Sequence, residues 1–194
     1  MTRLSSLLSV LASRSGLLVF MNLLFFGSVF FTALVLDFLL PPQLYTGPSG
    51  QFSGMFLSDN LILSVLNIFM FNLVVGSFVV VTLPGFVLFP LSAAFLVYRA
   101  FIWGALIFQS PSSVFLVTLP TLVLEGEGYV CAGVAGTLVG VSWIRPEWIY
   151  QAESESRTEH LKRGLGECGW LYVLVVVVLF IAAIVETATL ALIG

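Results

Sequence analysis

Long apolar runs, separated by short polar or proline-containing stretches, make up most of this chain. A bilayer core about 30 Å thick needs about 20 apolar residues to be crossed by a helix, so runs of this length predict membrane spans. The pattern predicts five of them, at about residues 17–40, 60–82, 86–108, 114–143 and 170–193. We therefore expect an all-α, polytopic membrane helix bundle in which residues 1–194 form a single membrane domain.

Prolines and glycines mark the expected ends of these helices. Pro41-Pro42 closes the first run, and Leu83-Pro84-Gly85 predicts a tight turn between the second and the third. The stretch 43–58 is rich in Gly, Pro, Ser and Gln, so we expect a loop outside the membrane there. The apolar part of a cleaved signal peptide is only about 7–15 residues long, so the longer first run is expected to remain as a span.

The fourth run, from Val114 to Trp143, is too long for a straight crossing. Its 30 residues would form a helix about 45 Å long, well beyond the hydrocarbon core. Tilt, or emergence from the membrane at one end, would absorb the excess. A kink or break between Pro120 and Gly128 would also absorb it, because Gly126 and Gly128 lower the helical preference just after the proline. We expect a kink or break in this segment.

Charged residues are sparse and unevenly placed. They make up 9% of the chain, whereas hydrophobic residues make up 59%; an ordinary soluble domain has about 25% charge. Most of them lie in the loop 144–168, where Glu and Arg spaced four residues apart favour a short surface helix. Basic residues occur there and near the N-terminus, and none occurs in 41–58 or 109–113. The positive-inside rule therefore predicts a multi-pass cell-membrane protein with a cytoplasmic N-terminus, a cytoplasmic 144–168 loop and an outside C-terminus.

Four charged residues lie well inside the predicted spans, namely Arg99, Glu125, Glu127 and Glu186, whereas Asp37 lies near the end of the first. A charged side chain at the centre of a membrane helix costs about 2.5–3.5 kcal/mol on insertion scales, so such groups face the bundle interior and pair with one another. Arg99 and Glu125 lie at compatible depths, and we expect them to pair with Glu186 close by. Two interpretations stay open: the cluster holds the helices in register, or it lines a polar path for an ion or substrate.

Small residues follow the two glutamates of the fourth run. Gly128, Ala132, Gly136 and Gly140 recur every four positions, and Gly133 lies beside them. This spacing places small side chains along one helix face, where a second helix can approach the backbone closely. That second helix could belong to this chain or to another protein, so internal packing and assembly both stay open.

The chain offers few groups for catalysis or for cofactor binding. Its single histidine, His160, lies in the charged loop, so the sequence has no HExxH zinc motif and no serine–histidine pair within the bilayer. Cys131 and Cys168 are expected to be ordinary core and boundary residues. We expect no enzyme activity, no metal site and no cofactor. Without a basic patch, nucleic acid is not an expected partner either.

Several short motifs, in their order and spacing, point to a known family. They are Pro120-x4-Glu125, Ala132-Gly133-x2-Gly136 and, in the last span, Ala182-Ala183-x2-Glu186. This arrangement resembles the membrane domain of stage II sporulation protein M. The resemblance covers roughly residues 59–190 and places Glu125 and Glu186 on the family's two glutamates. Thr121-Leu122 stands where that family carries His-Gly.

The resemblance implies a five-span, non-enzymatic membrane protein. The family's namesake acts like a scaffold: it gathers the peptidoglycan-remodelling stage II sporulation proteins D and P at a membrane. Relatives in organisms that never sporulate, some beside transport genes, broaden this expectation. We therefore expect a scaffold or assembly partner for membrane or cell-envelope machinery, working through other membrane proteins or self-association in the lipid bilayer. The alternative is a permease-like transporter subunit with a buried Arg/Glu site.

Overall fold

The chain folds into a bundle of long helices. A computed structural model describes residues 3–40, 58, 60–109, 112–150 and 156–193. The elements are α1 (Arg3–Ser13), α2 (Ser15–Leu39), α4 (Leu61–Met70), the π-helix η2 (Phe71–Thr82), α5 (Leu83–Val87), α6 (Pro90–Gln109), α7 (Ser112–Ile144), the short 3₁₀-helix η3 (Pro146–Trp148) and α8 (Arg157–Ile193). No strand occurs in the described ranges. The predicted all-α helix bundle is confirmed.

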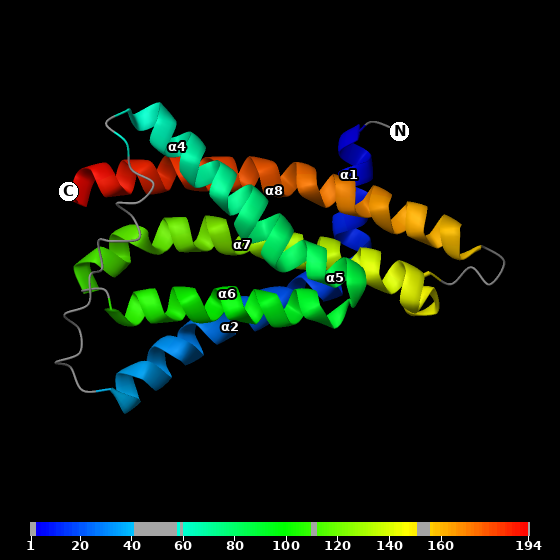
Figure 1. Cartoon of the computed structure of the whole chain (residues 1–194), viewed down its shortest axis with the longest axis horizontal. Coiled ribbons are helices and arrows are strands. Elements are labelled where there is room, and N and C mark those ends of the chain that lie inside the picture. The colour runs from blue at the N-terminus through cyan, green and yellow to red at the C-terminus, as the bar shows by residue number, and fades with distance from the viewer. Residues whose placement is uncertain (1–2, 41–57, 59, 110–111, 151–155, 194) are drawn as a thin grey trace.

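Five helical segments are long and apolar enough to cross a membrane. They are Ser15–Leu39, Leu61–Val87, Pro90–Phe108, Val114–Ile144 and Arg157–Ala191. In Figure 1 they run roughly along the long axis of the molecule, with α4, η2 and α5 crossing the others obliquely. The number of spans agrees with the expectation from hydropathy, which is a property of local sequence and needs no tertiary information.

The second span ends later than the sequence pattern indicated. We expected a tight turn at Leu83-Pro84-Gly85, but these residues begin α5, and the chain turns at Leu88, which is extended. The N–H of Leu83 donates to the carbonyl of Phe78, five residues back, at the end of the π-helix. Pro84 then occupies the first turn of α5, where a missing N–H is tolerated. The proline therefore marks a change of helix type and not the end of the helix.

The fourth span contains no break. α7 is a single α-helix of 33 residues with Pro120 inside it, so the expected break between Pro120 and Gly128 is wrong. Its glycines are covered by other helices: a Cβ on Gly126 would lie 2.7 Å from ring atoms of Phe25 and Phe26, and one on Gly128 would lie 2.6 Å from Leu179. This packing outweighs the weak local preference of glycine against helix, as tertiary context commonly does.

The last span begins earlier than expected. The charged residues 157–168 form the first turns of α8, so the surface helix expected there is continuous with the membrane helix. Its start is a capping box, in which the Ser156 N–H donates to Glu159 Oε2 at 2.8 Å. Glu159 is engaged in this cap, and Arg163 pairs with Glu167 at 3.6 Å.

The two ends of the bundle differ in character. α1 lies across the end where α7 finishes and α8 begins, whereas the C-terminus lies at the opposite end (Figure 1). Val10 of α1 is buried in the main hydrophobic cluster, and Arg14 forms an ion pair with Glu167 of α8. The N-terminal helix and the charged segment therefore share one end of the bundle. Which of the two ends faces the cytoplasm stays a prediction from the positive-inside rule.

α7 is the central helix of the bundle. Every one of its residues from Gly128 to Ser142 is buried, and it contacts α2, η2, α5, α6 and α8. Asn60 caps the second span, since its side chain accepts hydrogen bonds from the N–H groups of Ile62 and Leu63. Asp59 and residues 41–57 of the expected outer loop lie outside the described residues.

Candidate functional site

Glu125 is the hub of a polar cluster deep in the bundle. Its side chain is only 3% exposed. One carboxylate oxygen accepts a hydrogen bond from Asn72 Nδ2 at 2.5 Å, and the other lies 3.1 Å from the Tyr129 hydroxyl. A carboxylate in an apolar interior needs hydrogen-bond donors for its oxygens. Asn72 and Tyr129 supply these donors, which lipid chains lack.

Arg99 reaches this carboxylate through Tyr129 and not directly. Its Nη2 donates to the Tyr129 hydroxyl oxygen, and the guanidinium lies 4.5 Å from the centre of the same ring. The hydroxyl is 2.7 Å from Asn72 Oδ1. Arg99 and Glu125 also attract each other electrostatically across this bridge. The expected pair therefore exists as a relay, in which a fully buried tyrosine separates the two charges.

The π-helix provides the space for this relay. Asn72 and Gly76 both belong to η2, and a Cβ on Gly76 would lie 3.1 Å from Tyr129 Cε1 and 3.4 Å from Arg99 Nη2. A side chain at position 76 would therefore press on both members of the relay. π-helical turns in membrane and soluble proteins are often found at functional sites. Here the π-helix brings an amide and a glycine to the same buried spot.

Glu186 joins the cluster from α8. Its carboxyl group lies close enough to that of Glu125 for the two to interact electrostatically. Its second oxygen, Oε2, is buried and has no hydrogen-bond partner among the described residues. Glu186 is thus near Glu125 on α8, with its side chain half-buried and its Oε2 atom fully covered.

Glu127 is not part of this arrangement. It lies two residues from Glu125, which rotates its side chain by about 200° around the helix. The side chain is half-buried, and it interacts electrostatically with Cys131, one turn along on α7. Of the four predicted residues, the fold brings Arg99, Glu125 and Glu186 together and places Glu127 on another face.

The small residues of α7 pack against helices of the same chain. A Cβ on Gly136 would lie 2.7 Å from the carbonyl oxygen of Thr82, one on Gly140 would lie 2.9 Å from Phe89, and one on Gly133 would lie 3.3 Å from Leu96. The Thr82 hydroxyl donates to the carbonyl of Ala132 at 2.9 Å. This face is buried inside the protein, so internal packing is the interpretation that the structure supports.

Sequence reasoning did not select Asn72 or Tyr129 as site residues, although they supply most of the hydrogen bonds. For Tyr129 a signal was present, because it follows Glu125 by four residues and so lies on the same helix face. Asn72 could be noticed only as a polar residue inside a span. Its pairing with Glu125 joins positions 53 residues apart and depends on the packing of η2 against α7.

A second charged cluster lies at the α1 end of the bundle. Arg14 donates from Nε and Nη2 to the two carboxylate oxygens of Glu167, at 2.9 and 3.0 Å. The ring of Tyr150 lies beneath the guanidinium groups of both Arg14 and Arg163 and stacks on His160. These contacts fasten the N-terminal segment to the start of α8.

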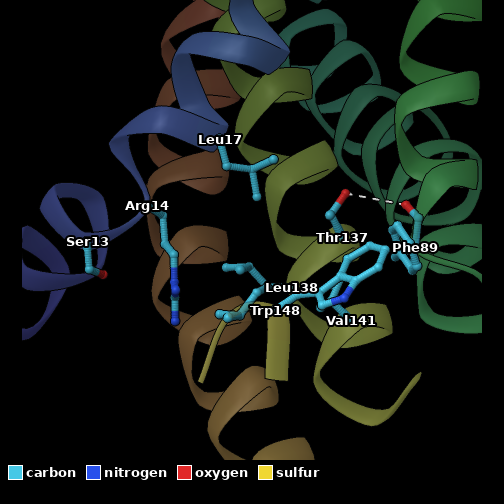
Figure 2. Close-up of a pocket in the computed structure, with 9 residues that line it drawn as sticks. Ser13, Arg14, Leu17, Phe89, Thr137, Leu138, Val141 and Trp148 are labelled. Carbon is cyan, nitrogen blue, oxygen red and sulfur yellow. Dashed lines mark hydrogen bonds between the residues drawn. The ribbon is translucent and has the colours of Figure 1, made fainter. Parts of the chain in front are cut away.

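A groove of about 350 Å³ opens beside this second cluster. Figure 2 shows Leu17, Leu138, Val141 and Trp148 around it, with Arg14 at one side and the Thr137 hydroxyl bonded to the carbonyl of Phe89. The residues that line the groove do not include Arg99, Glu125 or Glu186. The groove and the central polar cluster are therefore separate features at different depths.

The comparison with protein families gives one assignment. The family model described as Stage II sporulation protein M matches residues 16–189, nearly the whole chain. The chain belongs to the stage II sporulation protein M family. Neither the curated proteins nor the solved structures give a match. Together with the five spans, family membership makes this an integral membrane protein that crosses the bilayer several times.

The matched region of this stage II sporulation protein M family member contains both glutamates on which the resemblance rested. In the fold these two residues, Glu125 and Glu186, lie close together, although they are 61 residues apart in the sequence. Ala182 and Ala183, which precede Glu186, are fully buried in α8. Their small side chains allow α8 to lie close to its neighbours at the depth of the cluster.

Proposed function

We propose that this family member is a non-enzymatic membrane scaffold, whose central polar cluster locks the bundle so that its outer faces can hold other proteins. The observation that carries the proposal is the interlocking of four segments around Glu125. η2 contributes Asn72, α6 contributes Arg99, α7 contributes Tyr129 and α8 contributes Glu186. Polar contacts between membrane helices fix which helices are neighbours, and they do so most strongly where no water competes.

We expect a partner to bind to the exposed face of the C-terminal half of α2. Its large apolar side chains are strongly exposed, notably Phe31 at 68%, Leu34 at 71% and Phe38 at 87%. In Figure 1 the C-terminal end of α2 stands apart from α6. Aromatic residues are enriched in protein interfaces, and a partner helix would cover this face.

Cross-linking followed by purification from native membranes tests the scaffold. The expected result is stoichiometric recovery of a membrane or cell-envelope protein, reduced several-fold by the combined change Phe31→Ala and Phe38→Ala. Ile181→Ala with Ile184→Ala is the matched control, because these α8 residues are similarly apolar and each 45% exposed. Recovery of no partner, or equal loss with both double variants, would count against a scaffold that uses α2.

A permease-like subunit is the second candidate, and one observation favours it. Arg99 Nε and Glu186 Oε2 are buried polar atoms that have no hydrogen-bond partner among the described residues, and Arg99 lies beside Gly76 of the π-helix. A transported ion or substrate could use them. Glu125→Gln separates the candidates: if the variant folds and supports the same activity as the unaltered protein, no ion path runs through Glu125.

A further inference from the structure

The central cluster contains more acids than bases. Arg99 keeps its positive charge in every protein environment, because guanidinium does not deprotonate there. Glu125 and Glu186 would together carry two negative charges. If both were ionised, the cluster would bear one net negative charge inside the membrane, and two carboxylates in contact would repel each other.

The hydrogen bonds distinguish the two acids. Glu125 accepts a hydrogen bond from Asn72 on one oxygen, and its other oxygen lies 3.1 Å from the Tyr129 hydroxyl, whose one proton it shares with Asn72 Oδ1. The positive charge of Arg99 also attracts Glu125. Glu186 Oε2 has no donor within the described part of the chain. An ionised carboxylate only accepts hydrogen bonds, so a buried carboxylate oxygen without a donor costs desolvation free energy, whereas an un-ionised carboxyl can donate. The surroundings therefore stabilise negative charge on Glu125 and not on Glu186.

The register of α7 and α8 places another unused oxygen at the same depth. Gly128 lies against Leu179, and the helices run in opposite directions (Figure 1). Seven residues further along α8 is Glu186, and seven residues back along α7 is Thr121. Thr121 Oγ1 is buried without a hydrogen-bond partner in the described ranges, and Thr121 itself is 2% exposed. Although this hydroxyl lies at the depth of Glu186, it does not donate to the Glu186 carboxyl.

We propose that Glu125 and Glu186 form a single-proton site, in which the Glu186 carboxyl holds the proton and donates it in a hydrogen bond to the ionised Glu125. The cluster is then neutral, with one guanidinium and one carboxylate. Removal of the proton to water leaves both acids ionised and gives the cluster one net negative charge. This proposal goes beyond the scaffold function and does not depend on it.

The polar groups around the acid pair in the described residues come from η2, α6 and α7. They are Asn72 from η2, Arg99 from α6, and Thr121 and Tyr129 from α7. α2 presents Phe25, whose ring centre is 6.2 Å from that of Tyr129, and α4 presents Phe69, which packs on Phe180 of α8. Apart from the two acids, Arg99 and Tyr129 are the ionisable members of this set, and Arg99 is its permanent charge.

Infrared spectroscopy of the full chain in lipid nanodiscs tests the proton site. The unaltered protein should show the carbonyl band of an un-ionised carboxyl at neutral pH, shifted in D₂O. Glu186→Gln should remove one carboxyl equivalent from that band. Glu125→Gln should remove the same equivalent, because Glu186 must then ionise to balance Arg99. Glu127→Gln is the matched control and should leave this band unchanged.

Three outcomes would overturn the proposal. One is an unaltered protein without the band, and another is a Glu186→Gln protein that keeps it. The third is loss of the band when sodium replaces choline in the buffer, which would indicate a cation in the place of the proton. If neither Glu125→Gln nor Glu186→Gln folds, the spectra of the unaltered protein and of the Glu127→Gln protein decide between the outcomes. A band present in both supports the site, and its absence from both excludes it.

Discussion

The two charged clusters of this protein each pair an arginine with a glutamate, but with different geometry. At the α1 end, Arg14 meets the Glu167 carboxylate directly, through two parallel hydrogen bonds, with both side chains partly accessible to solvent. In the centre, Arg99 and Glu125 are separated by the hydroxyl of Tyr129 and share it with Asn72. One cluster is an ion pair, and the other is a hydrogen-bonded relay.

Depth explains the difference. Near the end of the bundle, water can hydrate the remaining faces of a guanidinium and a carboxylate, so a simple pair suffices. In the centre no water replaces a missing donor, and each polar atom needs a protein partner. The central cluster therefore recruits uncharged side chains from η2 and α7 around its charges. The comparison predicts that the centre is the more sensitive of the two to loss of a single group.

The largest effect is expected for Glu125→Ala. This change leaves the Asn72 amide without its acceptor and Arg99 without its nearest negative charge. Breaking a buried charged pair from one side costs about 3–5 kcal/mol. The free energy of unfolding, measured by denaturation in mixed detergent micelles, should fall by this amount. Glu125→Gln, which keeps one acceptor oxygen, should lose less. Equal losses in the two variants would show that volume and not hydrogen bonding governs the site.

A smaller effect is expected for Tyr129→Phe. The ring still fills its buried place, but the hydroxyl that bridges Arg99, Asn72 and Glu125 is lost. Leaving buried polar groups unsatisfied costs about 1–3 kcal/mol, measured by the same denaturation. Tyr98→Phe is a suitable control, because Tyr98 is 54% exposed. A Tyr129→Phe protein as stable as this control would contradict a relay through the hydroxyl.

Arg14→Gln should have a weaker effect than either change in the centre. The ion pair with Glu167 is partly buried, with side chains 14% and 12% accessible, so we expect it to contribute about 1 kcal/mol, near the upper end for ion pairs that touch solvent. A double-mutant cycle with Glu167→Gln measures the coupling, which should shrink as salt is raised because solvent ions still reach the pair. A coupling as large as that between Tyr129 and Glu125, and insensitive to salt, would abolish the distinction between the two clusters.

The α1 end should also weaken in alkali. The pKa of Tyr150 is raised to about 12. Burial is the main cause and the Glu167 carboxylate adds to it, whereas the guanidinium groups of Arg14 and Arg163 oppose the rise. An unfolded tyrosine releases its proton near pH 10. The folded state therefore holds the proton more tightly, and the stability that this contributes below pH 10 is lost between about pH 10 and pH 12. Protease cleavage of the N-terminal segment should increase over that window, and Tyr150→Phe should remove the Tyr150 contribution to it.

The smallest effect is expected for Glu127→Gln. This residue is half-buried on the face of α7 away from the cluster, so its replacement should change the free energy of unfolding by no more than about 0.5 kcal/mol. Detergent denaturation beside Glu125→Gln measures the contrast. A loss comparable to that of Glu125→Gln would indicate that Glu127 belongs to the central network.

The sequence by itself determined the number of spans, the uneven distribution of charge and the presence of acids and a guanidinium within the membrane. These are properties of local composition, because the bilayer sets the length of a crossing and penalises every buried charge wherever the other helices lie. The family motifs, too, are short and contiguous enough to be read along the chain. The expectation that Arg99, Glu125 and Glu186 gather in one place followed from the same penalty.

Only the tertiary structure decided how those groups meet. Asn72 and Tyr129 enter the cluster because η2 packs on α7, and Glu127 stays outside it because two residues of helix turn its side chain away. The helix through Pro84 and the unbroken α7 have the same origin, since neighbouring helices fill the space around local helix breakers. Local preferences are worth about 1 kcal/mol for glycine, and the packing of a central helix against five neighbouring segments exceeds them.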